Sequence, residues 1–144
     1  MNDQYFISVA RAIAQVSGEH DKDACIVVKD KAIVSQGTRG NRTRTGNYSL
    51  FVARRDPEVR EESSSSDNDW SVITAVEDAI TCAASRGVSL AGGIAYTLLA
   101  PRARDVLLLS ASGVKTILHD EQTKVGVDER IPLVMSRVRV ESVK

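Results

Sequence analysis

The sequence has few cysteines and no excess of either charge. Its two cysteines, Cys25 and Cys82, lie in an apolar run and in a helical pattern, and so small a number excludes a disulfide framework. We interpret both as reduced core residues. The 19 basic residues are balanced by 19 acidic ones. No global field therefore draws the molecule to nucleic acid, and any anion site has to be local.

Aromatic residues are also scarce, at 4% of the chain. Tyr48, Phe51 and Trp70 lie nearest to a basic stretch, where they could stack on single-stranded bases. Their small number and the zero net charge make nucleic-acid binding a weak alternative. For Trp70, which follows a possible helix cap, a core position is the more ordinary interpretation.

Long apolar runs are absent as well. No segment approaches the roughly 20 apolar residues that a membrane-spanning helix needs. The first residues, which include Asp3, lack the basic start of a secretory signal. We therefore expect a cytoplasmic protein without a membrane partner. What is present is a chain of 144 residues, 42% of them hydrophobic. This is enough for one domain with its own core, which we predict over residues 1–144.

Apolar periodicity predicts alternating helices and strands. The predicted helices cover residues 3–17, 69–87 and 101–112, and the predicted strands cover 24–28, 32–34, 94–99, 114–118 and 137–143. Asp3 and Asp69 are the predicted N-terminal caps of the first two helices, and Gly113 is predicted to end the third. This order predicts an α/β fold, a three-layer α/β/α sandwich around a central mixed sheet of about five strands.

One long segment, from about residue 38 to 69, shows no apolar periodicity. Its first part is basic, and its second part is polar and acidic and contains the serine run 63–66. A connection of this length inside a small domain is usually functional or mobile. We predict a long mobile loop.

Several short sequence segments, spread over nearly the whole chain, resemble those of a known protein family. They are ACIVV at 24–28, AIVSQG at 32–37, DAI at 78–80, AASRGV at 83–88 and AYTL at 95–98. Together with the order of elements, they resemble the cytidine and deoxycytidylate deaminase family. The resemblance implies the sandwich fold of that family. It also places residues 38–41, which include Arg39 and Asn41, where deoxycytidylate deaminases carry a turn at the nucleotide.

The resemblance further implies where a catalytic site would lie. In zinc deaminases a His or Cys on the central helix and two Cys at the start of the next helix bind zinc, while a Glu transfers protons. The four matching positions here hold Thr74, Val76, Arg102 and Asp105. Only the aspartate is a usual zinc ligand, the arginine carries a fixed positive charge, and valine cannot carry a proton. We therefore predict no catalytic residues, no metal and no cofactor, with zinc absent.

An alternative zinc site has no support in residue spacing. It would combine Cys25 and Cys82 with one of the two histidines, His20 or His119. Cys82 lies eight positions beyond Thr74, or about 12 Å along a helix, too far to replace the first ligand. We interpret the histidines as ordinary exposed residues.

Five arginines and one asparagine, expected near the predicted helix starts, are candidates for binding a phosphate. Guanidinium groups bind phosphate through two hydrogen bonds, and helix N-termini favour anions. The candidates are Arg39, Asn41, Arg42, Arg44, Arg102 and Arg104. They predict a retained nucleotide or phosphate site. The alternative is that these arginines solvate a loop and pair with acidic residues at 56, 58, 61 and 62.

The sequence therefore predicts a non-catalytic protein of deaminase fold, either nucleotide-binding or a regulatory or partner subunit. The resemblance implies a homo-oligomer or a hetero-oligomer with deaminase-fold subunits. The apolar run 106–109 is typical of a helix covered on two sides. The alternative is an active deoxycytidylate or cytidine deaminase-type hydrolase with divergent site residues, in which Glu77, Asp78 and Asp105 are candidate acids or bases.

Overall fold

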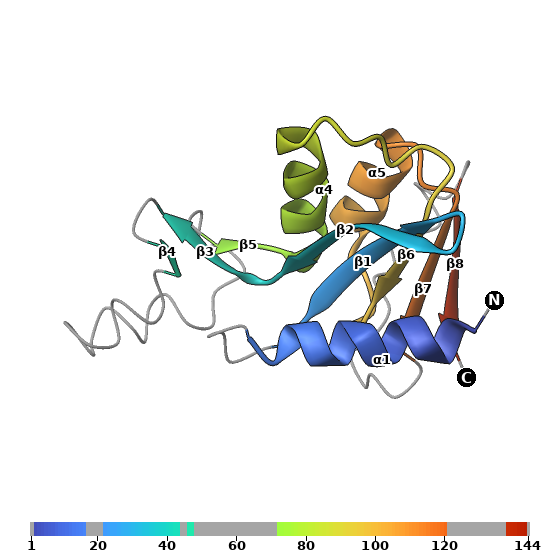
Figure 1. The fold of residues 1–144 in the computed structure, drawn as a ribbon, viewed down its shortest axis with the longest axis horizontal. Helices are drawn as coiled ribbons and strands as arrows, with labels where there is room; N and C mark the ends of the chain where they lie inside the picture. The colour runs from blue at the N-terminus through green and yellow to red at the C-terminus, as the bar shows by residue number, and fades with distance from the viewer. Residues whose placement is uncertain (1, 17–21, 44–45, 48–71, 121–137, 144) are drawn as a thin grey trace.

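The computed structural model describes residues 2–16, 22–43, 46–47, 72–120 and 138–143. These residues form three layers, with one helix below a sheet and two helices above it (Figure 1). The lower helix is α1 (Asp3–Ala14), and the upper helices are α4 (Ala75–Ser85) and α5 (Ala103–Ala111). The sheet, in spatial order, consists of β2 (Ala32–Thr38), β1 (Ala24–Lys29), β6 (Ile94–Thr97), β7 (Thr116–Asp120) and β8 (Arg139–Val143).

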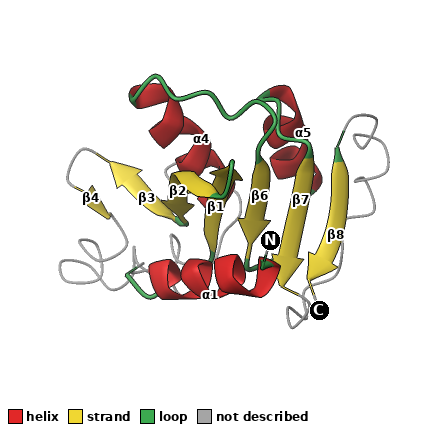
Figure 2. Cartoon of the chain, turned by 45° about the vertical axis from the view of Figure 1, so that its right-hand side comes forward, coloured by secondary structure: helices red, strands yellow, loops and turns green. Residues whose placement is uncertain are grey.

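The five-stranded sheet is mixed. Strand β1 runs antiparallel to both β2 and β6, whereas β6, β7 and β8 run parallel to one another (Figure 2). Helix α5 connects β6 to β7, because parallel neighbours need a crossover and cannot be joined by a tight turn. The predicted three-layer sandwich with about five strands is confirmed. The predicted edge strand near the C-terminus is also confirmed as β8.

Strand β1 lies at the centre of the core and is buried from Ala24 to Val28. Its side chains alternate between the two faces of the sheet. Cys25 and Val27 pack with the residues of α4 and α5. Ile26 and Val28 pack with Phe6 and other residues on the side of α1. The continuous apolar run arises because helices cover both faces of this strand.

The three helices are short, with 12, 11 and 9 residues. None of the helices among the described residues is long and apolar enough to span a membrane. The predicted N-cap of the first helix was wrong by one position, because Asn2 caps α1 and its side chain accepts a hydrogen bond from Tyr5 N at 3.2 Å. Asp3 instead accepts a hydrogen bond from the Tyr96 hydroxyl at 2.6 Å, which joins α1 to β6.

The central helix begins later than predicted. Helix α4 starts at Ala75, after the N-cap Thr74, and Val72–Ile73 form the short strand β5 instead of a first helical turn. A threonine that can form a reciprocal cap with Glu77 is a stronger helix start than an aspartate five residues earlier. The predicted cap Asp69 lies outside the described residues.

The segment predicted to be a loop contains strands where it is described. Strands β3 (Gly40–Thr43) and β4 (Gly46–Asn47) pair with each other, and β3 also pairs with β5. A segment without an apolar face can form a strand when a neighbour satisfies its backbone groups. Residues 48–69 of the predicted loop lie outside the described residues.

Strand β2 packs against α4 with almost no space between the two backbones. A Cβ atom added at Gly37 would lie 2.3 Å from the Ala79 nitrogen and 2.5 Å from the Ala75 carbonyl oxygen. The Ser35 hydroxyl donates a hydrogen bond of 2.6 Å to the Ala79 carbonyl. This close approach sets the position of α4, and with it the place of Thr74, relative to the sheet.

Candidate functional site

The N-terminus of α4 is held by a complete capping box. The Thr74 hydroxyl accepts a hydrogen bond from the Glu77 nitrogen at 3.1 Å, and the Glu77 carboxylate accepts one from the Thr74 nitrogen at 2.9 Å. Two of the first-turn N–H groups are therefore satisfied by the helix's own side chains. The cap fixes the Thr74 side chain at the start of the helix.

The start of α5 lies beside the start of α4, and one hydrogen bond joins them. The Thr74 hydroxyl donates to Oδ1 of Asp105 over 3.0 Å. The other oxygen, Oδ2, lies 3.5 Å from the backbone nitrogen of Arg102, the N-cap of α5. The Asp105 carboxylate therefore connects the two helix starts and also caps its own helix.

Asp105 is only 8% exposed. Burial raises the pKa of Asp105, and the nearby Glu77 carboxylate acts in the same direction. The hydrogen bonds from Thr74 and Arg102 and the charge of Arg102 oppose this shift. The threonine hydroxyl thus stabilises a carboxylate that would otherwise be costly to bury.

A second carboxyl group, Asp23, lies near Asp105. It directly precedes β1, and its Oδ1 accepts hydrogen bonds from the nitrogens of Ala24, Leu98 and Leu99 at 2.9, 3.2 and 3.0 Å. Burial raises the pKa of Asp23 to about 7. The three backbone hydrogen bonds oppose this shift, and the Asp105 charge makes the smallest contribution, which adds to it. The sequence analysis missed this residue, although an acid immediately before a fully apolar strand is a recognisable signal.

The pKa of the buried Cys25 thiol also depends on the nearby acidic residues. Burial raises the pKa of Cys25, and the charges of Asp23, Asp105 and Asp78 add to the effect. A thiol in this setting stays protonated and is a poor nucleophile or metal ligand. Cys25 is therefore a core residue, as predicted.

The structure brings together two of the four positions matched to the zinc-deaminase site. Thr74 and Asp105 are in direct contact, whereas Val76 points into the core and is 2% exposed. Arg102 is exposed at the start of α5. The donor set is thus a hydroxyl, a guanidinium and a carboxylate, which does not fit zinc. Within the described residues, no group of three His, Cys, Asp or Glu side chains is placed to hold a metal ion.

The candidate phosphate-binding residues lie in different surroundings. Arg39 is half-buried directly after β2, and its backbone nitrogen lies 3.5 Å from the Asp23 carbonyl oxygen. Arg102 and Arg104 are exposed at the start of α5. Asn41 and Arg42 belong to β3, but their side chains are outside the described set, as is Arg44 altogether. Because side chains cap both helix starts, an anion here would have to be bound mainly by arginine side chains.

Asp78, a candidate acid, has a structural partner. Its Oδ2 accepts a hydrogen bond from the Thr38 nitrogen at 2.9 Å, which ties α4 to the end of β2. His119 lies half-buried in β7, with Nδ1 3.4 Å from the Asp120 carbonyl oxygen. It is therefore less exposed than predicted, because its strand lies inside the sheet. His20 is outside the described residues.

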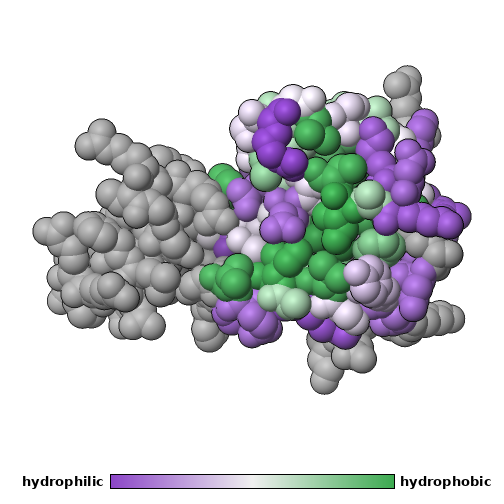
Figure 3. All heavy atoms as spheres, in the orientation of Figure 1, coloured by the Kyte–Doolittle hydropathy of each residue, from purple (hydrophilic) through white to green (hydrophobic). Residues whose placement is uncertain are grey.

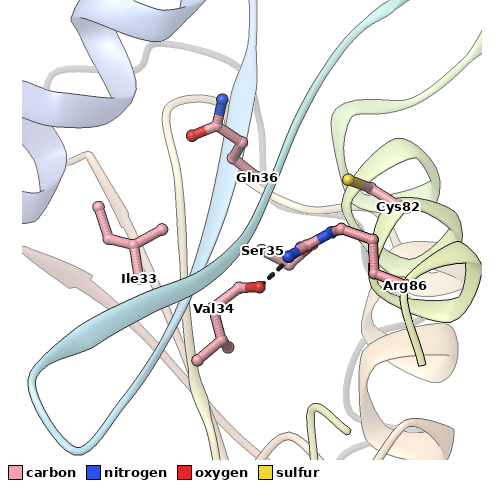
Figure 4. A pocket seen from close by; sticks show the side chains of 6 residues that line it. All are labelled: Ile33, Val34, Ser35, Gln36, Cys82 and Arg86. Carbon is pink, nitrogen blue, oxygen red and sulfur yellow. Dashed lines mark hydrogen bonds between the residues drawn. The ribbon is translucent and has the colours of Figure 1, made fainter. Parts of the chain in front are cut away.

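A shallow pocket of about 290 Å³ lies between β2 and α4, away from the helix starts. It is lined by Ile33, Val34, Ser35, Gln36, Cys82 and Arg86 (Figure 4). The Arg86 guanidinium reaches across it and donates a hydrogen bond of 2.8 Å to the Val34 carbonyl. The pairing of β1 with β2 shifts register here, so that Val34 is an extra, bulged residue.

Replacing Thr74 with alanine should destabilise the protein by about 1–2 kcal/mol, because it removes a helix cap and the hydrogen bond to a buried carboxylate. Thr81→Ala is the matched control, since its exposed hydroxyl bonds only to carbonyls of its own helix. Chemical denaturation of both variants measures the difference. Equal stabilities would show that the Thr74–Asp105 contact contributes nothing.

Comparisons with known proteins identify the fold. No protein-family model and no curated protein matches the sequence. Among solved structures, the chain is similar to the dCMP deaminase of cyanophage S-TIM5. The form in complex with dCMP and dUMP has a TM-score of 0.76 and 21% identity, covering 97% of this chain and 95% of that one. The apo form has a TM-score of 0.74 and 19% identity, covering 98% and 96%.

Two further solved structures with lower TM-scores also resemble this chain. A diaminohydroxyphosphoribosylaminopyrimidine deaminase/reductase from Thermotoga maritima has a TM-score of 0.59 and 17% identity, over 97% of this chain and 36% of that one. A structure from a study of A-to-I editing by tRNA deaminases has a TM-score of 0.59 and 18% identity, over 97% and 98%. At these identities the similarity shows the fold, which is cytidine-deaminase-like as predicted.

Proposed function

We propose that this chain is a non-catalytic protein of deaminase fold that binds a nucleotide without converting it. The observation that carries the proposal is the hydrogen bond of 3.0 Å between the Thr74 hydroxyl and the Asp105 carboxylate. By the family resemblance, both residues stand at zinc-ligand positions, and here they bind each other. We propose that zinc is absent and that no other cofactor replaces it.

The chemistry of the neighbouring residues supports this proposal. Hydrolytic deamination needs an activated water and a group that relays protons. Val76, at the position matched to the proton-transferring Glu, is buried and apolar. Glu77 is engaged with the Thr74 nitrogen, and Asp78 with the Thr38 nitrogen. For the alternative, an active deaminase-type hydrolase with divergent residues, Asp105 and Asp23 are the acids among the described residues that lie closest to the two helix starts.

The nucleotide part of the proposal rests on position and charge. Arg39 lies directly after β2, and its backbone contacts the Asp23 carbonyl close to the helix starts. A guanidinium there offers paired donors to a phosphate. The S-TIM5 structure contains dCMP and dUMP, so pyrimidine deoxynucleoside monophosphates are the first ligands to test. Arg42, Arg44, Arg102 and Arg104 remain further candidates.

Titration calorimetry with dCMP and dUMP, together with a deaminase assay and elemental analysis, tests the proposal. We expect binding of at least one of the two nucleotides, no conversion of dCMP, and no stoichiometric zinc. Arg39→Gln should abolish the binding heat. Lys115→Gln removes the same charge from an exposed residue before β7, at the opposite end of the parallel strands, and should leave binding unchanged.

Each part of the proposal has its own contrary result. If neither nucleotide gives a heat of binding, the proposal that the chain binds a nucleotide is wrong. Conversion of dCMP, or one zinc per chain in the purified protein, ends the non-catalytic part. A positive assay would leave the deaminase fold itself unaffected, since fold does not determine function.

We further propose that the chain associates with deaminase-fold subunits, either its own copies or a related protein. Hydrophobic side chains gather over the middle of the face seen in Figure 3. In the apolar run of α5, Val106 and Leu109 are buried within the domain, whereas Leu107 is 51% exposed. Light scattering on the calorimetry sample tests this part, and a monomer at micromolar concentration contradicts self-association.

A further inference from the structure

The sheet has two outer strands, and their outer edges differ in regularity. Strand β2 forms one edge and carries the bulge at Val34, whose carbonyl accepts the hydrogen bond from Arg86. Strand β8 forms the other edge (Figure 2), and its five residues pair with β7 without a shift in register. Among the strands that the structure describes, none pairs with the outer side of β8. A regular outer strand of this kind can pair with a further strand.

The pairing of β8 with β7 determines which of its backbone groups face outward. The Arg139 nitrogen donates a hydrogen bond of 3.0 Å to the Lys115 carbonyl, so the backbone groups of Arg139 face β7. The direction of these groups alternates from one residue to the next along a strand. Those of Val138, Val140 and Ser142 therefore face outward. In an antiparallel pair, residues that face each other in this way exchange hydrogen bonds. An added copy of β8 has to pair through the same outward-facing residues.

The side chains of β8 carry opposite charges two positions apart. The Arg139 and Glu141 side chains are 64% and 52% exposed, and Nε of Arg139 lies 3.5 Å from Oε1 of Glu141. Val140 lies between them on the other face of the sheet, where it packs against the core under α4 and α5. A strand that runs in the opposite direction can therefore place each of these charges beside an opposite one.

One symmetric register of two copies of β8 brings the opposite charges together. When Val140 lies opposite Val140 of a second copy, Arg139 lies opposite Glu141 on both sides of the two-fold axis. The neighbouring registers that the hydrogen bonds allow are centred on position 139 or 141, and they place two arginines or two glutamates opposite each other. Opposite charges stabilise a cross-strand pair, and like charges destabilise it. The backbone directions and the charges therefore select the same register.

We propose that two copies of this chain associate through β8, as antiparallel strands centred on Val140. This dimer is one form of the association proposed above, on which the assignment of the surface rests, and its partner is a second copy rather than a related protein. Arg139 then forms a non-hydrogen-bonded pair with Glu141 of the second copy, the type of pair in which opposing side chains lie closer together. Because both copies use the same edge, the pairing is two-fold symmetric and ends at a dimer.

Two charge-reversed variants test the pairing, first alone and then mixed. Arg139→Glu brings glutamates together at positions 139 and 141, and Glu141→Arg brings arginines together there. Each variant alone should dimerise roughly tenfold more weakly than the wild type, because two attractive pairs become two repulsive ones. The mixture should form a heterodimer, since each chain then meets opposite charges. Analytical ultracentrifugation measures all three cases, and circular dichroism checks that both variants fold.

Lys31→Glu is the matched control for these variants. It reverses an exposed charge in the turn between β1 and β2, beside the other outer strand. This variant should dimerise as the wild type does. A weakening as large as that of Arg139→Glu would show a general effect of net charge and would contradict a specific pairing at β8.

A pair of cysteines tests the register independently of charge. Cys82→Ser first removes the half-buried native thiol, while Cys25 is buried. Mixing Arg139→Cys with Glu141→Cys should then give a disulfide-linked dimer under mild oxidation, because Cα atoms in a non-hydrogen-bonded pair lie about 4.5 Å apart. Either cysteine variant alone should give far less of this dimer, since position 139 faces position 141 and not itself.

The result that contradicts the association differs from those that contradict only its surface. A wild type that stays monomeric at every concentration tested contradicts both. A wild-type dimer that the charge-reversed variants retain at full strength places the association elsewhere and overturns the role of β8 alone, and so does a mixture without heterodimer. If a charge-reversed variant fails to fold, the cysteine variants decide. Equal cross-linking in the mixture and in the single variants overturns the register.

The nucleotide-binding part of the proposed function is unaffected by any of these outcomes, because it is measured separately by calorimetry.

Discussion

Gly37→Ala is expected to leave most of the protein unfolded. The added Cβ would lie 2.3 Å from the Ala79 nitrogen and 2.5 Å from the Ala75 carbonyl oxygen, and both are backbone atoms of α4. A backbone cannot rotate away as a side chain can, so α4 has to move off β2 and take Thr74 with it. We expect a loss of more than about 3 kcal/mol, a large share of the stability of a typical domain. Circular dichroism and denaturant titration measure it.

Gly87→Ala is the control for this substitution. Gly87 ends α4 with φ of +68°, and a Cβ there meets nothing within 4 Å. Alanine at this position should cost only about 1 kcal/mol, from the left-handed conformation alone. If Gly37→Ala is no more damaging than Gly87→Ala, then β2 and α4 are not packed as closely as described.

Zinc binding should appear when the three ligand positions are rebuilt. The triple variant Thr74→His, Arg102→Cys and Asp105→Cys places one imidazole and two thiolates where Thr74 and Asp105 now touch at 3.0 Å. Three protein ligands of these types hold zinc in catalytic sites, with a water in the fourth position. We expect one zinc per chain by elemental analysis and a higher Tm with zinc than with a chelator, against no effect in the wild type.

The control variant keeps the same residue types but separates them. It combines Arg102→Cys and Asp105→Cys with Thr81→His, and Thr81 is exposed two turns along α4. This variant should not bind zinc with the same affinity. If the rebuilt variant folds and binds no more zinc than the control, then positions 74, 102 and 105 do not converge, and the match to zinc-deaminase ligand positions is wrong.

Most of the fold could be predicted from local patterns. The apolar run of β1 requires cover on both faces, and α1 and α4 provide it in the positions that the periodicity indicated. Gly113 ends the third helix with φ of +90°, as its place after the apolar run predicted. These features depend on neighbours in the sequence, so the sequence is sufficient to find them.

The site was predictable only in part, because its contacts are long-range. The family resemblance selected Thr74 and Asp105 as matched positions. It did not predict that these two residues, 31 positions apart in the sequence, form a hydrogen bond with each other. Asp23 bonds to Leu98 and Leu99, 75 and 76 positions away, and no periodicity reports such a pairing. The start of α4 was misplaced because Asp69 is also a common cap residue. The capping box of Thr74 with Glu77 and the pairing of Val72–Ile73 with β3 both favour the later start.

The bulge at Val34 affects the edge of the sheet that β2 forms. An outer strand with regular spacing invites another chain to extend the sheet, which is the route to fibrils. Here the extra residue breaks the spacing, and the Val34 carbonyl already accepts a hydrogen bond from Arg86. The bulge and the Arg86 contact therefore make β2 a less regular edge for the addition of another strand than an unbroken strand would be.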